Sequence, residues 1–85
     1  MTNTGVKTQI EPTISFYPNP AKEGFHIKGL TETGMLTLTN LEGKLMLTKQ
    51  VADNEYVSIS SFTDGTYIAN LVTNSFSIER KIIKR

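Results

Sequence analysis

Hydrophobic and polar residues alternate along most of the chain after Thr13. Short runs of apolar and β-branched residues carry this period of two, and Gly, Asn, Asp or Pro residues separate the runs. Such runs favour half-buried β-strands. The pattern predicts seven strands, at about residues 14–17, 24–28, 35–41, 44–51, 55–60, 66–73 and 76–84. No segment of useful length has the period of a helix.

The same alternation predicts which side chains face the interior. Glu42-Gly43 and Asp64-Gly65 stand between runs and favour tight hairpins, because glycine adopts a positive φ without steric cost. One apolar and one wet face per strand are typical of antiparallel sheets packed face to face. We therefore predict an all-β fold, an immunoglobulin-like antiparallel β-sandwich of about seven strands. Its predicted inner set is Phe25, Ile27, Leu36, Leu38, Leu45, Leu47, Val57, Ile59, Tyr67, Ala69 and Leu71.

The composition narrows the function classes. The chain has 85 residues, a formal net charge of +1 and no cysteine. This length is enough for one small domain. A near-neutral charge with few aromatic residues argues against a nucleic-acid partner, and no apolar run approaches the ~20 residues of a membrane-spanning helix. Without cysteine, the chain has no disulfide framework and no thiolate metal site.

The first residues differ in character from the rest. Residues 1–12 are polar apart from isolated apolar positions and end in Pro12, which predicts a linker. Residues 13–85 then form the folded domain. The N-terminus lacks the basic start and apolar stretch of a signal peptide. Either the chain is cytoplasmic or it is the C-terminal part of a longer precursor, and we favour the second.

The chain carries no residue pattern typical of an active site. His26 is the single histidine, and the alternation places it on the wet face, opposite Phe25 and Ile27. Ser58 and Ser60 lack a Gly-x-Ser-x-Gly elbow, and the glutamates are scattered without pairing. There is no glycine-rich phosphate loop. We predict no enzyme, no cofactor and no small-molecule substrate.

Pro18-Asn19-Pro20 stands between the first two predicted strands. Its prolines remove two backbone donors, and Pro20 favours an extended Asn19. The segment is therefore expected to form an exposed edge, a bend or a strand switch. It is either a rigid corner or a rigid surface epitope, and the two roles are compatible.

Two further elements have both a structural and a functional interpretation. Gly65-Thr66-Tyr67 begins a hairpin strand, and Tyr67 enters the core with a hydroxyl that needs a partner or a wet rim. The run Lys81-Ile82-Ile83-Lys84-Arg85 places basic side chains on the last predicted strand. These charges either protect an edge strand from aggregation or are read by a partner.

Four stretches, in this order and spacing, make the chain similar to a known family. They are Phe16-Tyr17-Pro18-Asn19-Pro20-Ala21, Asn40-Leu41-Glu42-Gly43-Lys44, Ile59-Ser60-Ser61-Phe62-Thr63-Asp64-Gly65-Thr66-Tyr67-Ile68 and Lys81-Ile82-Ile83-Lys84-Arg85. Over residues 13–85 the chain resembles the C-terminal sorting domain of the type IX secretion system of Bacteroidetes, in its compact subtype. The family's Pro-x-Pro-x-x-Gly element is matched by Pro18, Pro20 and Gly24 with one extra residue. Its Gly-x-Tyr element falls on Gly65 and Tyr67, and its terminal lysine-rich element falls on Lys81 and Lys84, with Arg85 where some members have lysine.

The resemblance implies a seven-strand sandwich that serves as an export signal. The fused upstream cargo would cross the inner membrane with its own signal peptide, fold in the periplasm and pass an outer-membrane translocon with a shuttle component. A sortase-like peptidase would then remove the domain, with cleavage in the linker at residues 1–12. The cargo would end on the cell surface or in the medium. Recognition by this machinery would fall on Pro18, Asn19, Pro20, Gly65, Tyr67, Lys81, Ile82, Ile83, Lys84 and Arg85.

We hypothesise that the signal is a folded surface. Lys81, Lys84 and Arg85 would face an acidic or carbonyl-lined groove, and the last strand could add to a partner's sheet edge. Removing the last five residues is then expected to abolish export and to leave most of the fold.

Two other functions stay open. One is a non-catalytic adhesin or carbohydrate-binding β-sandwich module, and the other is a structural spacer. Carbohydrate-binding modules usually present an aromatic platform on one sheet face. We expect no such platform here, because Tyr17, Tyr56 and Tyr67 are scattered in the sequence. An exposed edge strand can also pair weakly with a second copy of the chain.

Overall fold

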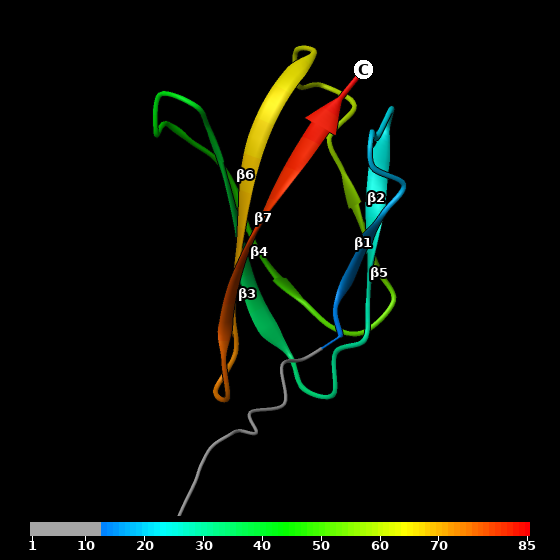
Figure 1. Ribbon diagram of the computed structural model, residues 1–85, viewed down its shortest axis with the longest axis vertical. Coiled ribbons are helices and arrows are strands. Elements are labelled where there is room, and N and C mark those ends of the chain that lie inside the picture. Colours follow the sequence, from blue (N-terminus) through cyan, green and yellow to red (C-terminus); the bar gives the residue numbers. More distant parts are fainter. Residues whose placement is uncertain (1–12) are drawn as a thin grey trace, which may run out of the picture.

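The computed structural model describes residues 13–85, and this part of the chain holds seven strands and no helix (Figure 1). Each predicted strand is present, with ends within two residues of the prediction. Residues 1–12, where the linker and its cleavage are predicted, lie outside the described residues. The strands are β1 (Ser15–Tyr17), β2 (Gly24–Lys28), β3 (Gly34–Asn40), β4 (Leu45–Val51), β5 (Glu55–Ser58), β6 (Gly65–Val72) and β7 (Ser77–Lys84).

The strands form two antiparallel sheets that pack face to face. The three-stranded sheet has the order β1-β2-β5, and the four-stranded sheet has the order β4-β3-β6-β7. Figure 1 shows the sheets as the two sides of the molecule, with the β3–β4 hairpin flaring outward at one end. The predicted β-sandwich is confirmed. Across residues 13–85, no helix is long and apolar enough to span a membrane.

The inner faces of both sheets form the core. No polar or charged side chain is buried among the described residues. Complete burial of an Ile, Leu or Phe side chain contributes about 1.5–3 kcal/mol, so this set provides most of the favourable free energy of folding. The buried members of the predicted set are Phe25, Ile27, Leu36, Leu38, Val57, Ile59, Tyr67, Ala69 and Leu71, and Ile14, Ala21, Leu30, Val51 and Ile82 complete the core.

Leu45 contradicts the predicted inner face, because 57% of it is exposed. The pairing of β3 with β4 shifts between Leu38 and Thr39, so that Leu38 faces Leu47 while Thr39 faces Leu45. This β-bulge places Met46 as an extra residue between the two pairs, and Met46 and Leu47 pack against the core. An extra residue reverses the faces of the side chains on its far side, here Leu45, relative to a regular alternation. The prediction for Leu45 was therefore wrong.

Candidate recognition surface

The Pro18-Asn19-Pro20 segment lies against the last strand of the molecule. It follows β1, and Figure 1 shows the end of β7 crossing toward this part of the three-stranded sheet. The Asn19 side chain bridges two backbone groups of β7: Nδ2 donates to the Lys81 carbonyl at 2.8 Å, and Oδ1 accepts from the Ile83 N–H at 3.0 Å. These groups are 62 and 64 residues apart in the chain. The amide thus takes the place of a neighbouring strand.

Ala21 continues the same contact with its backbone. Its N–H donates to the Ile83 carbonyl at 2.7 Å, and its carbonyl accepts from the Arg85 N–H at 2.9 Å. Ala21 and Lys84 form a parallel bridge, and Ala21 is fully buried. We call Asn19 and Ala21 the clamp. Because the clamp occupies the outer backbone groups of residues 81–85, this stretch offers no free edge to a partner strand.

The five terminal residues have different environments. Ile82 is fully buried in the core, and Ile83 is half-buried on the other face of β7. Lys81 and Arg85 are exposed. Pro18 and Pro20 are also exposed, on either side of Asn19. The structure therefore leaves Lys81, Ile83 and Arg85 accessible, whereas Ile82 holds the strand in place.

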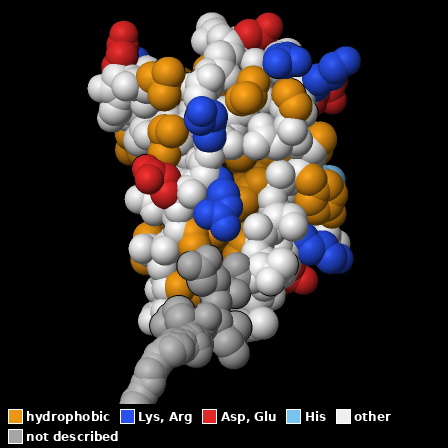
Figure 2. Space-filling model, viewed as in Figure 1, with side chains coloured by type: hydrophobic (Ala, Val, Ile, Leu, Met, Phe, Trp, Pro, Cys, Tyr) orange, Lys and Arg blue, Asp and Glu red, His pale blue; other side chains and the backbone are white. Residues whose placement is uncertain are grey.

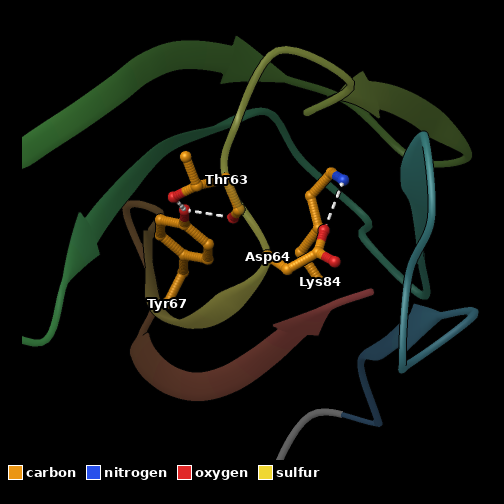
Figure 3. Close-up of polar contacts among 4 residues, drawn as sticks. All are labelled: Thr63, Asp64, Tyr67 and Lys84. Atoms are coloured by element: carbon orange, nitrogen blue, oxygen red, sulfur yellow. Dashed lines mark hydrogen bonds and ion pairs between the residues drawn. The ribbon is translucent and has the colours of Figure 1, made fainter.

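Lys84 makes an ion pair within the domain (Figure 3). Its Nζ lies 3.2 Å from Asp64 Oδ1, and only 10% of the Lys84 side chain is exposed, against 73% for Asp64. Asp64 belongs to the turn before β6. The ion pair fastens the end of β7 to this turn, directly beside the Gly65-Thr66-Tyr67 element.

Tyr67 completes the turn from the inside. Its ring is buried beside Phe62, with ring centroids 5.1 Å apart, and its hydroxyl donates to the Thr63 carbonyl at 2.6 Å (Figure 3). The predicted need for a hydroxyl partner is met in this way. Gly65 has φ +154°, which side chains seldom adopt. Gly65 and Tyr67 thus shape the turn that carries Asp64.

The three predicted elements therefore meet at one end of the sandwich. The clamp joins Pro18-Asn19-Pro20 to β7, and Lys84 joins β7 to the turn before Gly65 and Tyr67. Sequence reasoning missed the parts played by Ala21 and Asp64. The Asp64-Gly65 dipeptide gave a turn signal, but no local pattern assigns Lys84 as its partner.

An aromatic row crosses the outer face of the three-stranded sheet, against the expectation that the tyrosines are scattered. Tyr17 pairs with His26, and His26 pairs with Tyr56 on the next strand. Their ring centroids lie 5.4 Å and 5.0 Å apart. His26 is half-buried between the tyrosines. The prediction failed because strand order, and not spacing in the sequence, brings Tyr17 and Tyr56 to one side of the molecule.

Nothing in this arrangement resembles a metal centre, since residues 13–85 contain no group of three or more His, Asp or Glu side chains that could hold an ion. A comparison with curated proteins found no match. The family model of the secretion system C-terminal sorting domain matches residues 15–85, a span that includes all seven strands, the clamp and the terminal basic residues. The chain therefore belongs to the family of secretion system C-terminal sorting domains, the C-terminal sorting signals of type IX secretion.

Proposed function

We propose that this domain directs a fused upstream cargo through the type IX machinery by presenting one folded surface at the end where β7 is clamped. The observation that carries the proposal is the double hydrogen bond of Asn19 to β7, because it joins two family elements that are 62 and 64 residues apart. An unfolded chain has no such surface.

The proposed sorting surface consists of the exposed side chains around the clamp, namely Pro18, Pro20, Lys81, Ile83 and Arg85. Asn19, Ile82, Lys84, Gly65 and Tyr67 hold it in shape. Figure 2 shows Lys and Arg side chains over the upper and central part of the viewed face, with apolar side chains between them. This mixture suits a groove that is lined by carbonyl or carboxylate oxygens and has apolar contacts.

The charges act together in this proposal. An exposed ion pair is worth about 0.2–1 kcal/mol, so neither Lys81 nor Arg85 alone supplies useful affinity. Strand addition at residues 81–85 is disfavoured, because the clamp already uses the outer backbone groups there. The side chains, rather than the backbone, are therefore the proposed signal.

The wider route follows from family membership and stands as part of the proposal. Residues 13–85 are the sorting domain, and residues 1–12 are the linker to the cargo. The cargo passes through the periplasm, where the domain meets the outer-membrane translocon, a shuttle component and a sortase-like peptidase. Cleavage in the linker then leaves the cargo on the cell surface or releases it.

The test is a secretion assay. A periplasm-targeted fluorescent protein carries residues 1–85 at its C-terminus, in a type IX-competent strain and in its translocon-null twin. Reporter on the surface or in the medium of the competent strain alone is the expected result. Retention in the periplasm of both strains, with the domain shown to be folded, would contradict the proposal.

A carbohydrate-binding or adhesive module is the second candidate. The row of Tyr17, His26 and Tyr56 supplies the aromatic cluster that such a module needs. However, the rings of Tyr17 and His26 are stacked, with only 21° between their planes. Their broad faces are therefore turned to one another, so that the row does not offer a flat platform to a sugar ring.

A further inference from the structure

A hollow of about 290 Å³ opens where the β3–β4 hairpin flares away from the sandwich (Figure 1). The turn of this hairpin borders the hollow on one side, and the turn before β6 borders it on the other. Met46, which packs against the core, and the buried Tyr67 also line it. We call this space the hairpin hollow. None of the exposed side chains of the proposed sorting surface lines it, although both regions adjoin the turn that carries Asp64 and Gly65.

The hairpin turn beside the hollow is closed by hydrogen bonds to Asn40. The Asn40 side-chain oxygen accepts from the N–H groups of Glu42 and Lys44, both at 2.9 Å. The Asn40 backbone adds two bonds of 3.0 Å, one from Gly43 N–H and one to the Lys44 carbonyl. Gly43 has φ +88°, which a residue with a side chain rarely adopts. The turn thus holds the backbone of Leu41 and Glu42 in place, so that a partner loses little by ordering it.

Leu41 gives the hollow an apolar border. It is 69% exposed, the highest value for a large hydrophobic side chain among residues 13–85. A single exposed leucine is common on protein surfaces, but this one stands on a held turn and shares a hollow with the half-buried Met46. A side chain that enters the hollow would cover both of them. The hollow therefore favours a ligand with an apolar part.

The charged side chains of the hollow determine the other part of the ligand. Glu42 and Asp64 line it, and no lysine, arginine or histidine does. Asp64 uses Oδ1 for the ion pair with Lys84, but 73% of its side chain is exposed, which leaves Oδ2 for another donor. Glu42 makes no ion pair within residues 13–85. A metal ion fits poorly, because this part of the chain has no group of three ligating side chains. The carboxylates therefore suit an organic cation beside the apolar part.

We infer that the hairpin hollow binds a protein segment that presents a lysine or arginine next to an apolar residue. The cation pairs with the carboxylates of Glu42 and Asp64, and the apolar residue packs against Leu41 and Met46. Such a segment complements the hollow in charge and in apolar surface at once, which favours it over a purely basic or a purely apolar ligand. This site does not rest on the proposed function, because it uses none of the exposed side chains of the sorting surface.

The experiment follows the backbone amide NMR signals of the whole chain during titration with a short blocked peptide that has one arginine between two leucines. Saturable shifts are expected at Leu41, Glu42, Asp64 and Thr66. Glu42→Gln should weaken binding by about 1.5- to 5-fold, as expected for the loss of one exposed ion pair. Leu41→Ala should weaken it by about fourfold or more, the equivalent of at least one buried methylene group.

Two matched variants and two peptides are the controls. Glu79→Gln removes an exposed carboxylate from β7, and Val72→Ala shortens an exposed side chain at the far end of β6. Neither residue lines the hollow, so both variants should keep the native affinity. A peptide with glutamate in place of arginine should give no saturable shifts, and one with serines in place of the leucines should bind more weakly.

Equal binding of the arginine and glutamate peptides, equal effects of test and control variants, or no saturable shifts at the hollow would each overturn the inference. Shifts at the hollow that depend on the concentration of the chain alone would also overturn it, because they would assign the hollow to a second copy.

Discussion

At the scale of single residues, the domain depends on side chains that take the place of backbone. Asn19 offers one donor and one acceptor to β7, as a strand would, in a segment where two prolines have removed the backbone donors. A glutamine at this position would be longer by one methylene group, and an aspartate would lack the donor to the Lys81 carbonyl. The position therefore specifies asparagine by its hydrogen bonds.

We predict that Asn19→Ala loosens the end of β7. Two net hydrogen bonds at about 0.5–1.5 kcal/mol each imply a loss of roughly 1–3 kcal/mol in the free energy of unfolding. The amide of Ile83 should exchange faster with solvent, as measured by hydrogen exchange. Asn19→Asp keeps the acceptor, so its free energy of unfolding should lie between those of Asn19→Ala and the native chain. Asn74→Ala, in the exposed β6–β7 turn, is the control, and equal effects from both alanine variants would contradict the role of the clamp.

Asp53 makes the fold sensitive to acid. One carboxylate oxygen accepts from Gly29 N–H at 2.6 Å and from Leu30 N–H at 3.0 Å. The bond from Gly29, more than the others, holds the pKa of Asp53 below its usual value of 3.8, although partial desolvation opposes this effect. The stabilisation is therefore complete above the unfolded pKa and disappears as the pH falls through the lower folded pKa.

Asp53→Asn should flatten the acid limb of the stability curve. In the native chain, the free energy of unfolding should decline between about pH 5 and pH 2, because protonation of Asp53 weakens its bonds to the backbone. The variant should show a smaller decline, measured by denaturant unfolding at several pH values. A smaller pH dependence of the same sign should remain in the variant, because the Ser75 side chain also lowers the pKa of Glu32. An unchanged slope in Asp53→Asn would refute the assignment.

At the scale of elements, β7 is a core strand that also carries exposed residues of the proposed sorting surface. Ile82 lies in the core, Lys84 reaches Asp64, and Lys81 and Arg85 are exposed. The period-two pattern placed the strand correctly, but its inward residue Ile82 was not in the predicted inner set. The clamp could not be foreseen, because nothing in the sequence near Asn19 indicates a bond to Lys81 and Ile83. The bulge at Met46 was hidden for a similar reason, since Leu45 and Leu47 alternate regularly.

The structure changes what a truncation should do. Deleting residues 81–85 removes the buried Ile82 and all four clamp hydrogen bonds. Loss of a buried isoleucine alone costs about 2–5 kcal/mol, comparable with the whole stability of a small domain. We now predict that this truncation unfolds the domain, which circular dichroism and thermal melting would show. A cooperative melt like that of the native chain would contradict this prediction.

A variant that removes the exposed charges and keeps the core tests recognition more directly than the truncation does. Lys81→Ala with Arg85→Ala should leave the melting temperature nearly unchanged and weaken recognition by about 2- to 30-fold, from two contacts of about 0.2–1 kcal/mol each. The secretion assay at limiting expression measures this change. Lys28→Ala with Lys44→Ala removes the same charge from exposed positions away from the clamp. Equal export defects in both pairs would favour net charge over a localised surface.

At the scale of the whole molecule, the proposed sorting surface requires that both sheets are assembled. The chain passes between sheets three times, after β2, β4 and β5, and the last strand then meets the first loop. The alternation in the sequence was enough to predict the β-sandwich and most of the residues in its core. It could not give the strand order, which places Tyr17 beside His26 and Tyr56 and brings the three family elements together.

We therefore predict that export follows the folded fraction of the domain. Leu38→Ala removes a fully buried side chain and should cost about 2–5 kcal/mol, with a matching fall in export. Thr37→Ala, on the opposite face of the same strand, should affect both properties little. Native-level export by a Leu38→Ala domain that is shown to be unfolded would indicate a linear peptide signal.

The clamp has a mechanical consequence. The described chain enters at one end of the sandwich and β7 finishes at the other end, as Figure 1 shows. If cargo is attached before β1 and a partner grips the end of β7, tension runs lengthwise along these strands. Asn19 and Ala21 hold β7 through four hydrogen bonds, and lengthwise tension loads those bonds in shear, together rather than one after another. Under the proposed function, the clamp would therefore let the folded domain bear a pulling force between its two ends without losing β7.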